Sequence, residues 1–148
     1  MDASAPRRPA RRVIAAVLLA GVIGAGLAVH ALLPDTAMTD IAGDSLYAGA
    51  AYLAVAIVAP RLAPLVVGAL AAAWCIAIEL FQLTGIPMQL GAIFPPAMLV
   101  FGTVFDGRDL LVYVVTLVVL VGADAVVAVL RGTATTDPRR PEESATPT

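Results

Sequence analysis

Three carboxylates lie in segments that are otherwise apolar, and each has a polar neighbour at helical spacing. The six candidate residues of this polar set are Asp44, Tyr47, Glu79, Gln82, Asp109 and Tyr113. Residues three or four apart share one face of a helix, so each carboxylate is expected to lie beside its polar neighbour. If the three carboxylates converge, their full ionisation in a low dielectric is unfavourable unless Arg108 or a bound cation offsets the charge. The pattern therefore indicates a site for a proton, a cation or a polar head group.

Two of these carboxylates also have a simpler interpretation. Asp44 and Asp109 lie where helices are expected to begin, and an anion there accepts hydrogen bonds from free backbone N–H groups. This interpretation does not extend to Glu79, which lies near the carboxyl end of its helix, where the helix dipole disfavours a negative charge. For Glu79 we predict a role in a site or in a polar network.

The elements that must hold these residues are membrane-spanning helices. Of the 148 residues, 60% are hydrophobic and 14% are charged, and a soluble domain of this size could not bury so much apolar surface. Four apolar stretches are long enough, or nearly so, to cross about 30 Å of hydrocarbon as helices. They cover residues 13–33, 41–59, 62–83 and 110–130. The predicted fold class is all-α, a polytopic transmembrane helical bundle with four spans.

A fifth apolar segment, residues 90–105, is too short for a clear span and contains Pro95-Pro96. Proline removes a backbone donor and disfavours helix at the preceding residue, so we predict a break at Phe94. A broken helix exposed to lipid would leave backbone groups unpaired. The segment is therefore predicted to be a re-entrant or buried half-helix.

The nine arginines decide between the two topologies. With four spans, eight arginines lie on one side and Arg108 lies on the other, whereas five spans give a split of six to three. The positive-inside rule favours four spans with both termini in the cytoplasm. The chain then divides into a basic cytoplasmic N-terminus (1–12), a transmembrane domain (13–131) and a disordered cytoplasmic tail (132–148). Glu79 lies 18 residues after Arg61, which places it about 27 Å from the cytoplasmic end, near the outer boundary.

Helical geometry also predicts which surfaces meet. Trp74 and Phe81 project away from Glu79, so they are expected to face lipid while the carboxylate turns inward. Asp124 is expected to pair with Arg131 or to reach the inner boundary. Small residues recur every four positions, which either favours close helix packing or reflects the abundance of alanine. These rows are Ala16, Ala20, Gly24 and Ala28 in the first span, and Ala69, Ala73 and Ala77 in the third.

Composition excludes several classes of site. With one cysteine, Cys75, an intrachain disulfide is excluded, and with one histidine, His30, so is a site of several imidazoles in one chain. No nucleophile and base pair and no metal-ligand spacing is recognisable, so we predict no catalytic residue, no metal and no cofactor. The expected partners are membrane lipids and further copies of the chain in a homo-oligomer, with no nucleic acid.

The ordered motifs resemble a known family. They are Gly43-Asp44-x-Leu46-Tyr47-Ala48, Glu79-Leu80-x-Gln82-Leu83, Gly102-x-x-Phe105 and Asp109-Leu110-Leu111-x-Tyr113. This set resembles an uncharacterised family of small bacterial membrane proteins, the domain of unknown function 2809, and is similar, more distantly, to the VanZ-like proteins. The resemblance covers roughly residues 13–122 and implies a multi-span protein of the bacterial cell membrane. It carries no activity, and the Arg-x-Thr element that tends to precede Gly102 in the family is absent here.

Three functions are compatible with this pattern. The one we favour is an integral membrane protein, more in keeping with binding than with catalysis, whose outer-leaflet acidic pocket binds a lipid head group or an envelope component. The second is a small transporter or channel for protons or cations, which with four spans would require an oligomer. The third is a membrane enzyme acting on a lipid-linked substrate, with Glu79 as acid or base and Asp44 and Asp109 holding a divalent ion.

Overall fold

The computed structural model describes residues 7–133, and every regular element in that range is a helix. Four helices are long: α1 (Arg7–Leu32), α2 (Ala37–Val58), α3 (Pro64–Gln82) and α6 (Gly107–Thr133). Three short elements separate α3 from α6, namely α4 (Ile86–Ile93), the 3-10 turn η1 (Pro95–Ala97) and α5 (Met98–Phe101). The predicted all-α bundle is therefore confirmed. The segments 1–6 and 134–148, which include half of the predicted basic N-terminus and most of the predicted tail, lie outside the described residues.

The four long helices are each long and apolar enough to cross a membrane. The spans are Arg11–Leu32, Ala37–Val58, Pro64–Gln82 and Gly107–Leu130, with mean hydropathies of 2.3, 1.6, 2.0 and 2.6. Large apolar side chains cover the outside of the bundle, where Val17, Leu65 and Val118 are 67%, 72% and 66% exposed. Such a surface is costly in water and is the expected surface in lipid. The length, composition and exposed surface of the helices are those of a multi-pass membrane protein.

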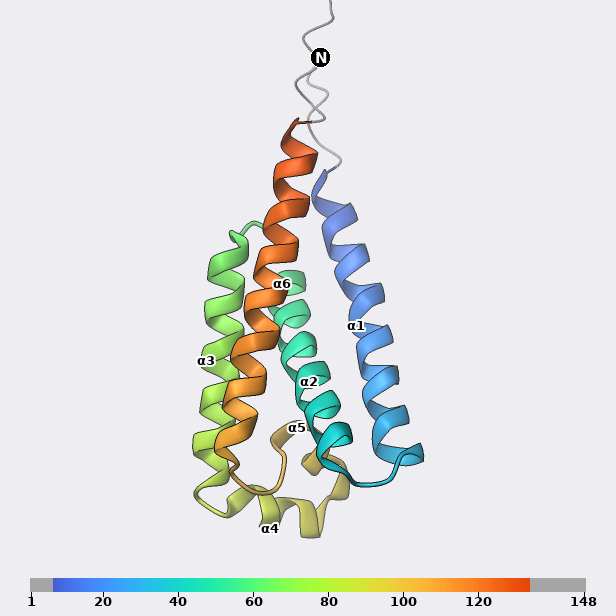
Figure 1. Cartoon of the computed structure of the whole chain (residues 1–148), viewed down its shortest axis with the longest axis vertical. Helices are drawn as coiled ribbons and strands as arrows, with labels where there is room; N and C mark the ends of the chain where they lie inside the picture. Colours follow the sequence, from blue (N-terminus) through green and yellow to red (C-terminus); the bar gives the residue numbers. More distant parts are fainter. Residues whose placement is uncertain (1–6, 134–148) are drawn as a thin grey trace, which may run out of the picture.

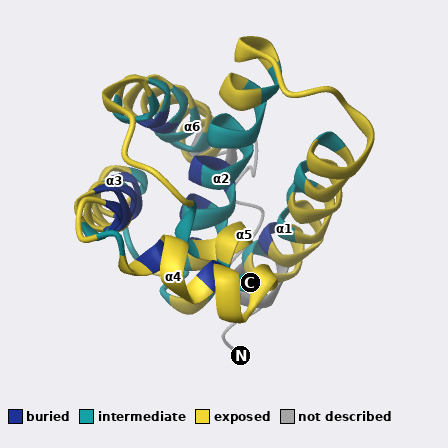
Figure 2. Ribbon diagram, turned by 90° about the horizontal axis from the view of Figure 1, so that it is seen from below, coloured by how far each residue is buried: buried dark blue, intermediate teal, exposed yellow. Residues whose placement is uncertain are grey.

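The second helix is the centre of the arrangement. It packs against α1, α3 and α6, and α3 also packs against α6. Among the described elements, α1 packs against α2 alone. The long helices run side by side, with α4 and α5 gathered at one end (Figure 1). Viewed from that end, α2 lies between α1 on one side and α3 and α6 on the other (Figure 2).

Small side chains let α2, α3 and α6 approach closely. The buried core is formed by Ala15, Ala48, Tyr52, Ala56, Val67, Ala71, Cys75, Tyr113 and Leu117. Gly68 is part of this contact, because a Cβ atom there would collide with the side chain of Val121. The small-residue rows predicted from spacing do not supply this packing. All seven of those residues are exposed, so the prediction that these rows pack the helices of one chain is wrong.

Helix α2 begins earlier than predicted. Thr36 is its N-cap, and the side chains of Thr36 and Thr39 cap each other's backbone N–H groups, with O–N distances of 3.3 and 2.8 Å. This capping box sets the helix start at Ala37. Asp44 therefore lies two turns inside the helix, and the interpretation of Asp44 as an N-terminal anion is wrong. Asp109 does lie in the first turn of α6.

The segment between α3 and α6 is broken where proline predicts it. Phe94 ends α4 with φ −136° and ψ 88°, and Pro95 begins the next turn. No element between α3 and α6 exceeds 8 residues, so none of these described elements spans the membrane. The predicted re-entrant or buried half-helix corresponds to the short helix α4, which buries Pro87 and Gly91 and leaves Ile93 and Phe94 at its end 84% and 62% exposed. This segment lies across the end of the bundle (Figure 1).

Candidate functional site

A cavity of about 490 Å³ opens at the end of the bundle where α5 and the α1–α2 connection lie. The C-terminal turns of α1 and α3, the first half of α2, the loop 102–106 and the start of α6 also line it. Its acidic and basic lining residues are His30, Asp35, Asp40, Asp44, Asp106, Arg108 and Asp109. We call this space the end cavity. Five aspartates thus face one arginine and one histidine among the described residues that line it.

The structure brings five of the six candidate residues to the wall of the end cavity. These are Asp44, Tyr47, Gln82, Asp109 and Tyr113. The sixth, Glu79, lies behind this wall and is 0% exposed. Tyr113 donates a hydrogen bond to Glu79 Oε1 at 3.1 Å, and the backbone N–H of Asp106 donates to Oε2 at 3.4 Å. Glu79 therefore ties α3 to α6 and to the loop 102–106, and it supports the cavity wall from behind.

Two carboxyl groups from different helices line the cavity near one another. Asp44 of α2 and Asp109 of α6 both line the space and are close enough to interact electrostatically. Two carboxylates are both acceptors, so a direct contact between them would require a shared proton or a donor placed between them. Asp44 Oδ2 is buried and has no hydrogen-bond partner among residues 7–133.

Gln82 is the second polar side chain with an unpaired atom. Its Nε2 donates to the carbonyl of Phe101 at 3.0 Å, whereas its buried Oε1 finds no partner within the described part of the chain. The side chain is tightly confined, because Gly102 passes directly over the amide with φ +64°. Any residue with a Cβ would collide with Gln82 at that position. The amide is thus fixed by its donor end, and its acceptor end is left for the cavity.

Tyr47 links the cavity wall to the membrane-facing surface. Its hydroxyl donates to the carbonyl of Val100 at 2.8 Å and accepts from Trp74 Nε1 at 3.1 Å. The expectation that Trp74 and Phe81 simply face lipid holds only in part. Trp74 is 48% exposed but points its polar edge at Tyr47, and Phe81 packs edge-to-face on Phe101 with 5.8 Å between ring centroids. Both aromatic residues help to hold the short helix α5 over the cavity.

Two aspartates that line the cavity, Asp40 and Asp106, were not among the predicted site residues, whereas Arg108 was expected to offset the acidic charge. Asp40 and Arg108 form an exposed ion pair at 3.4 Å, and Asp106 Oδ1 accepts from the backbone N–H of Arg108 at 2.8 Å. The available signal was the cluster Asp106-Gly107-Arg108-Asp109, which marks the start of a helix rich in charge. The early start of α2 was needed to bring Asp40 to the same place.

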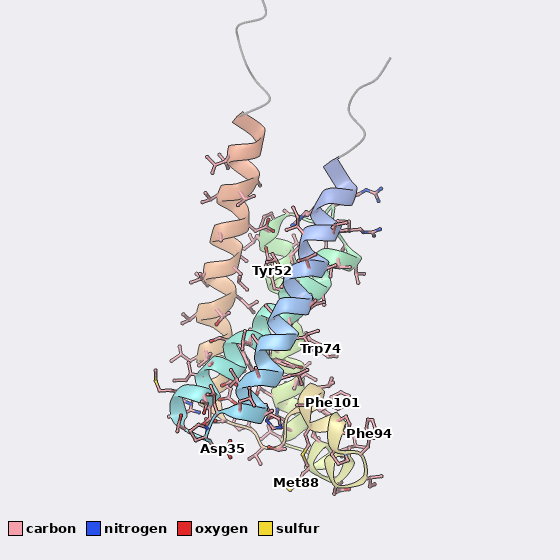
Figure 3. The ribbon with its side chains drawn as sticks, turned by 90° about the vertical axis from the view of Figure 1, so that its right-hand side faces the viewer. Asp35, Tyr52, Trp74, Met88, Phe94 and Phe101 are labelled. Carbon is pink, nitrogen blue, oxygen red and sulfur yellow. The ribbon has the colours of Figure 1, made fainter. Side chains whose placement is uncertain are left out.

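A second polar cluster lies toward the other end of the bundle. Arg11 donates to Asp124 Oδ2 at 2.7 Å, and the hydroxyl of Tyr52 donates to the same oxygen at 2.8 Å. Arg11 also donates to the carbonyls of Pro60 and Leu62, at 2.7 and 3.1 Å. We call Arg11, Tyr52 and Asp124 the Arg11 cluster; Tyr52 lies well away from Asp35 in Figure 3. Asp124 was expected to pair with Arg131, whose side chain lies outside the described residues, and the structure gives Arg11 of α1 as its partner.

The fold and this polar end define the chain as an all-α, multi-pass membrane protein. It belongs to the family of proteins of unknown function DUF2809, whose sequence profile matches residues 33–116, more than half of the chain. The match contains all six candidate residues and excludes Arg11 and Asp124. No curated protein and no solved structure matches the chain significantly.

Proposed function

We propose that the protein is an integral protein of the bacterial cell membrane that binds a positively charged group of a lipid head group or envelope component in the end cavity. The observation that carries this proposal is the charge of the lining: five aspartates against one arginine, in a space of about 490 Å³. Carboxylates crowded beside lipid repel one another, and a cationic ligand relieves that repulsion. The apolar residues Val29, Leu33 and Leu99 line the same space and suit the uncharged part of such a ligand.

The proposed orientation follows from the arginines at the two ends. Arg11 and Arg12 donate to carbonyls of residues 57–62, next to Arg61. Arg108 lines the end cavity at the other end. The positive-inside rule then places the Arg11 end and both termini in the cytoplasm and the end cavity in the outer leaflet.

Binding is favoured over transport by the layer between the two polar regions. Tyr113 and Asp124 are 11 residues apart on α6, which corresponds to roughly 16 Å along the helix. The core along that length is formed by apolar side chains such as Ala71, Cys75 and Leu117. A proton or cation relay requires polar groups along its path. A single copy of the bundle is therefore better suited to hold a ligand at one end than to pass it through.

Catalysis at a bound metal is less favoured by the same geometry. In the part of the chain that the structure describes, no group of three or more His, Cys, Asp or Glu side chains is arranged to hold a metal ion. The likeness to VanZ-like proteins stays a prediction and lends no activity to the proposal. A homo-oligomer also stays a prediction, for which the exposed rows of small residues on α1 and α3 offer surfaces.

The proposal can be tested through the single tryptophan. Trp74 donates to Tyr47, which lines the end cavity, so its fluorescence should respond when the cavity is filled. In uncharged maltoside micelles, short-chain lipids with cationic or zwitterionic head groups should change this fluorescence saturably. Dihexanoylphosphatidylglycerol, which has an anionic head group, should not.

A pair of variants separates the site from general attraction to an acidic surface. The double substitution of Asp44→Asn and Asp109→Asn should abolish the saturable response. Asp35→Asn removes a carboxylate from the exposed α1–α2 connection, and it should weaken binding much less because that charge is screened by solvent. If no cationic or zwitterionic probe produces a saturable change, or if the double variant responds like the natural chain, the proposed function is wrong.

A further inference from the structure

The end cavity contains more hydrogen-bond acceptors than the protein can satisfy. Gln82 is only 8% exposed, its Oε1 has no donor within residues 7–133, and it faces the cavity. Asp44 Oδ2 is also buried and has no hydrogen-bond donor within the described residues. A buried acceptor without a donor costs free energy comparable to a lost hydrogen bond. Both atoms therefore favour a cavity ligand that brings its own donors.

The carboxyl groups of Asp44 and Asp109 also favour a ligand that brings hydrogen-bond donors. Asp44 and Asp109 both line the cavity and interact electrostatically, and neither can donate while ionised. Arg108 does not fill this role, since its guanidinium pairs with Asp40 at 3.4 Å in the exposed part of the lining and acts on Asp44 and Asp109 only through its charge. An N–H group with a positive charge, placed between Asp44 and Asp109, would satisfy both carboxylates and offset their repulsion.

From these acceptors we infer that the ligand of the end cavity is a primary ammonium group, carried by a zwitterionic phospholipid head group. The inference rests on the proposed function and deepens it by naming the ligand chemistry. A primary ammonium has three N–H donors, whereas a trimethylammonium group has none. Only the primary ammonium can pair with Asp44, Asp109 and the Gln82 carbonyl. A quaternary group is recognised instead by aromatic faces, and it would leave these acceptors unpaired.

Other features of the lining favour a lipid as the source of the amine. Arg108 is the one arginine among the described residues that line the cavity, and it directly precedes Asp109 in the first turn of α6. It is therefore placed to attract the phosphate of a head group whose ammonium lies beside Asp109. The apolar wall on α1 is not packed against α3 or α5, since α1 packs along α2 among the described elements and its contact with α6 is the Arg11–Asp124 pair toward the other end. That side of the cavity can admit a lipid from the membrane.

The test compares head groups that differ only in N-methylation. Trp74 fluorescence is followed in maltoside micelles while dihexanoylphosphatidylethanolamine, its N,N-dimethyl form or dihexanoylphosphatidylcholine is added. The ethanolamine lipid should bind at least roughly tenfold more tightly than the choline lipid, because each charge-assisted hydrogen bond that is lost costs about that factor. Free ethanolamine should bind more weakly than the ethanolamine lipid, and Arg108→Gln should remove most of that difference.

Gln82→Met should weaken binding of the ethanolamine lipid several-fold more than binding of the choline lipid, because only the ethanolamine lipid can donate to the Gln82 carbonyl. The matched control is Gln89→Met, because Gln89 is an exposed glutamine on α4 that does not line the cavity. Thermal melting of each variant shows whether the bundle is intact. If Gln82→Met does not fold, the N-methyl series on the natural chain still decides, since it needs no substitution.

The outcomes separate this inference from the proposal beneath it. Preference for the ethanolamine lipid that declines with each methyl group supports the inference. Equal binding of ethanolamine and choline lipids, with loss in the Asp44→Asn and Asp109→Asn double variant, overturns the inference and leaves the proposed function standing. Free ethanolamine binding as tightly as the lipid overturns the lipid source. Absence of binding by every head group overturns both the inference and the proposed function.

Discussion

The two polar regions of this bundle lie toward opposite ends, and they differ in how completely their groups are paired. In the Arg11 cluster, one carboxylate oxygen of Asp124 accepts from both Arg11 and Tyr52, and Arg11 has two further acceptors in backbone carbonyls. In the end cavity, Asp44 and Asp109 lie near one another and are both acceptors. The Arg11 cluster is thus a closed network, in which these groups are paired, and the end cavity is an open network, in which acceptors lack donors.

The difference has a physical meaning for each region. A closed network of opposite charges holds the described start of α1 to the α2–α3 connection and to α6, so its role is structural. An open set of like charges stabilises nothing by itself and persists where it serves a ligand. The DUF2809 match covers most of the end-cavity lining, from Leu33 to Tyr113, and stops short of Arg11 and Asp124. The comparison predicts that substitutions in the Arg11 cluster mainly lower stability, whereas substitutions in the end cavity mainly weaken ligand binding.

The largest effect on stability is expected at the Arg11 cluster. Asp124→Ala leaves the Arg11 guanidinium and the Tyr52 hydroxyl without their carboxylate, which should lower the free energy of unfolding by about 2–4 kcal/mol. Unfolding in bicelles by titration with sodium dodecyl sulfate would measure it. Combining it with Arg11→Met should recover part of the loss, because no unpaired charge then remains. A loss below about 0.5 kcal/mol for Asp124→Ala would mean that the cluster is not structural.

The next effect is expected in the loop that closes the end cavity. Gly102→Ala places a Cβ against the Gln82 amide, at a residue with φ +64° and ψ −162°, a region used almost only by glycine. It should destabilise the bundle by about 2 kcal/mol and should weaken ligand binding as well. The control is Gly122→Ala, which meets no atom within 4 Å in α6 and should stabilise slightly. Equal effects at both glycines would show that the conformation of Gly102 is not important.

A smaller effect is expected behind the cavity wall. Tyr113→Phe removes the hydroxyl that donates to the fully buried Glu79 and should cost about 1–2 kcal/mol in unfolding free energy. The double variant with Glu79→Leu should cost less than the sum of the two single substitutions, since both remove the same Tyr113–Glu79 hydrogen bond and the double variant loses it only once. Additive effects would indicate that the two residues act independently. The same bicelle titration provides all three values.

Much of this arrangement is predictable from the sequence. The four spans, the inward direction of Glu79 and the break at Phe94 follow from apolar length, helical period and proline chemistry. These features depend on neighbours within a few residues along the chain. The structure confirms the four long helices, the burial of Glu79 and the end of α4 at Phe94.

What the sequence did not predict depends on contacts between distant segments. Pairing of Asp124 with Arg11 requires knowing that α1 packs on α2 beside the α2–α3 connection, since the two residues are separated by 113 positions. The bond from the Asp106 backbone to Glu79 and the passage of Gly102 over Gln82 arise from the path of an irregular loop, which has no period to read. The predicted start of α2, near residue 41, was based on apolar length, whereas the capping box of Thr36 and Thr39 begins the helix at Ala37.

The smallest effect on stability, and the sharpest contrast with the Arg11 cluster, is expected for Asp44. Asp44→Asn removes a charge that forms no ion pair among the described residues and lies near another carboxylate, with Arg108 acting on it only through its charge, so the unfolding free energy should change by less than about 1 kcal/mol or should rise. Asp124→Asn makes the same chemical change where the charge is paired, and it should be clearly destabilising. The effects on ligand binding should be reversed. Asp44→Asn should abolish binding of the ethanolamine lipid, whereas the Asp124→Asn variant should still bind it to the extent that the variant is folded. If Asp44→Asn destabilises the bundle as much as Asp124→Asn, the open network is structural too, because an aspartate kept for a ligand should cost stability when the ligand is absent.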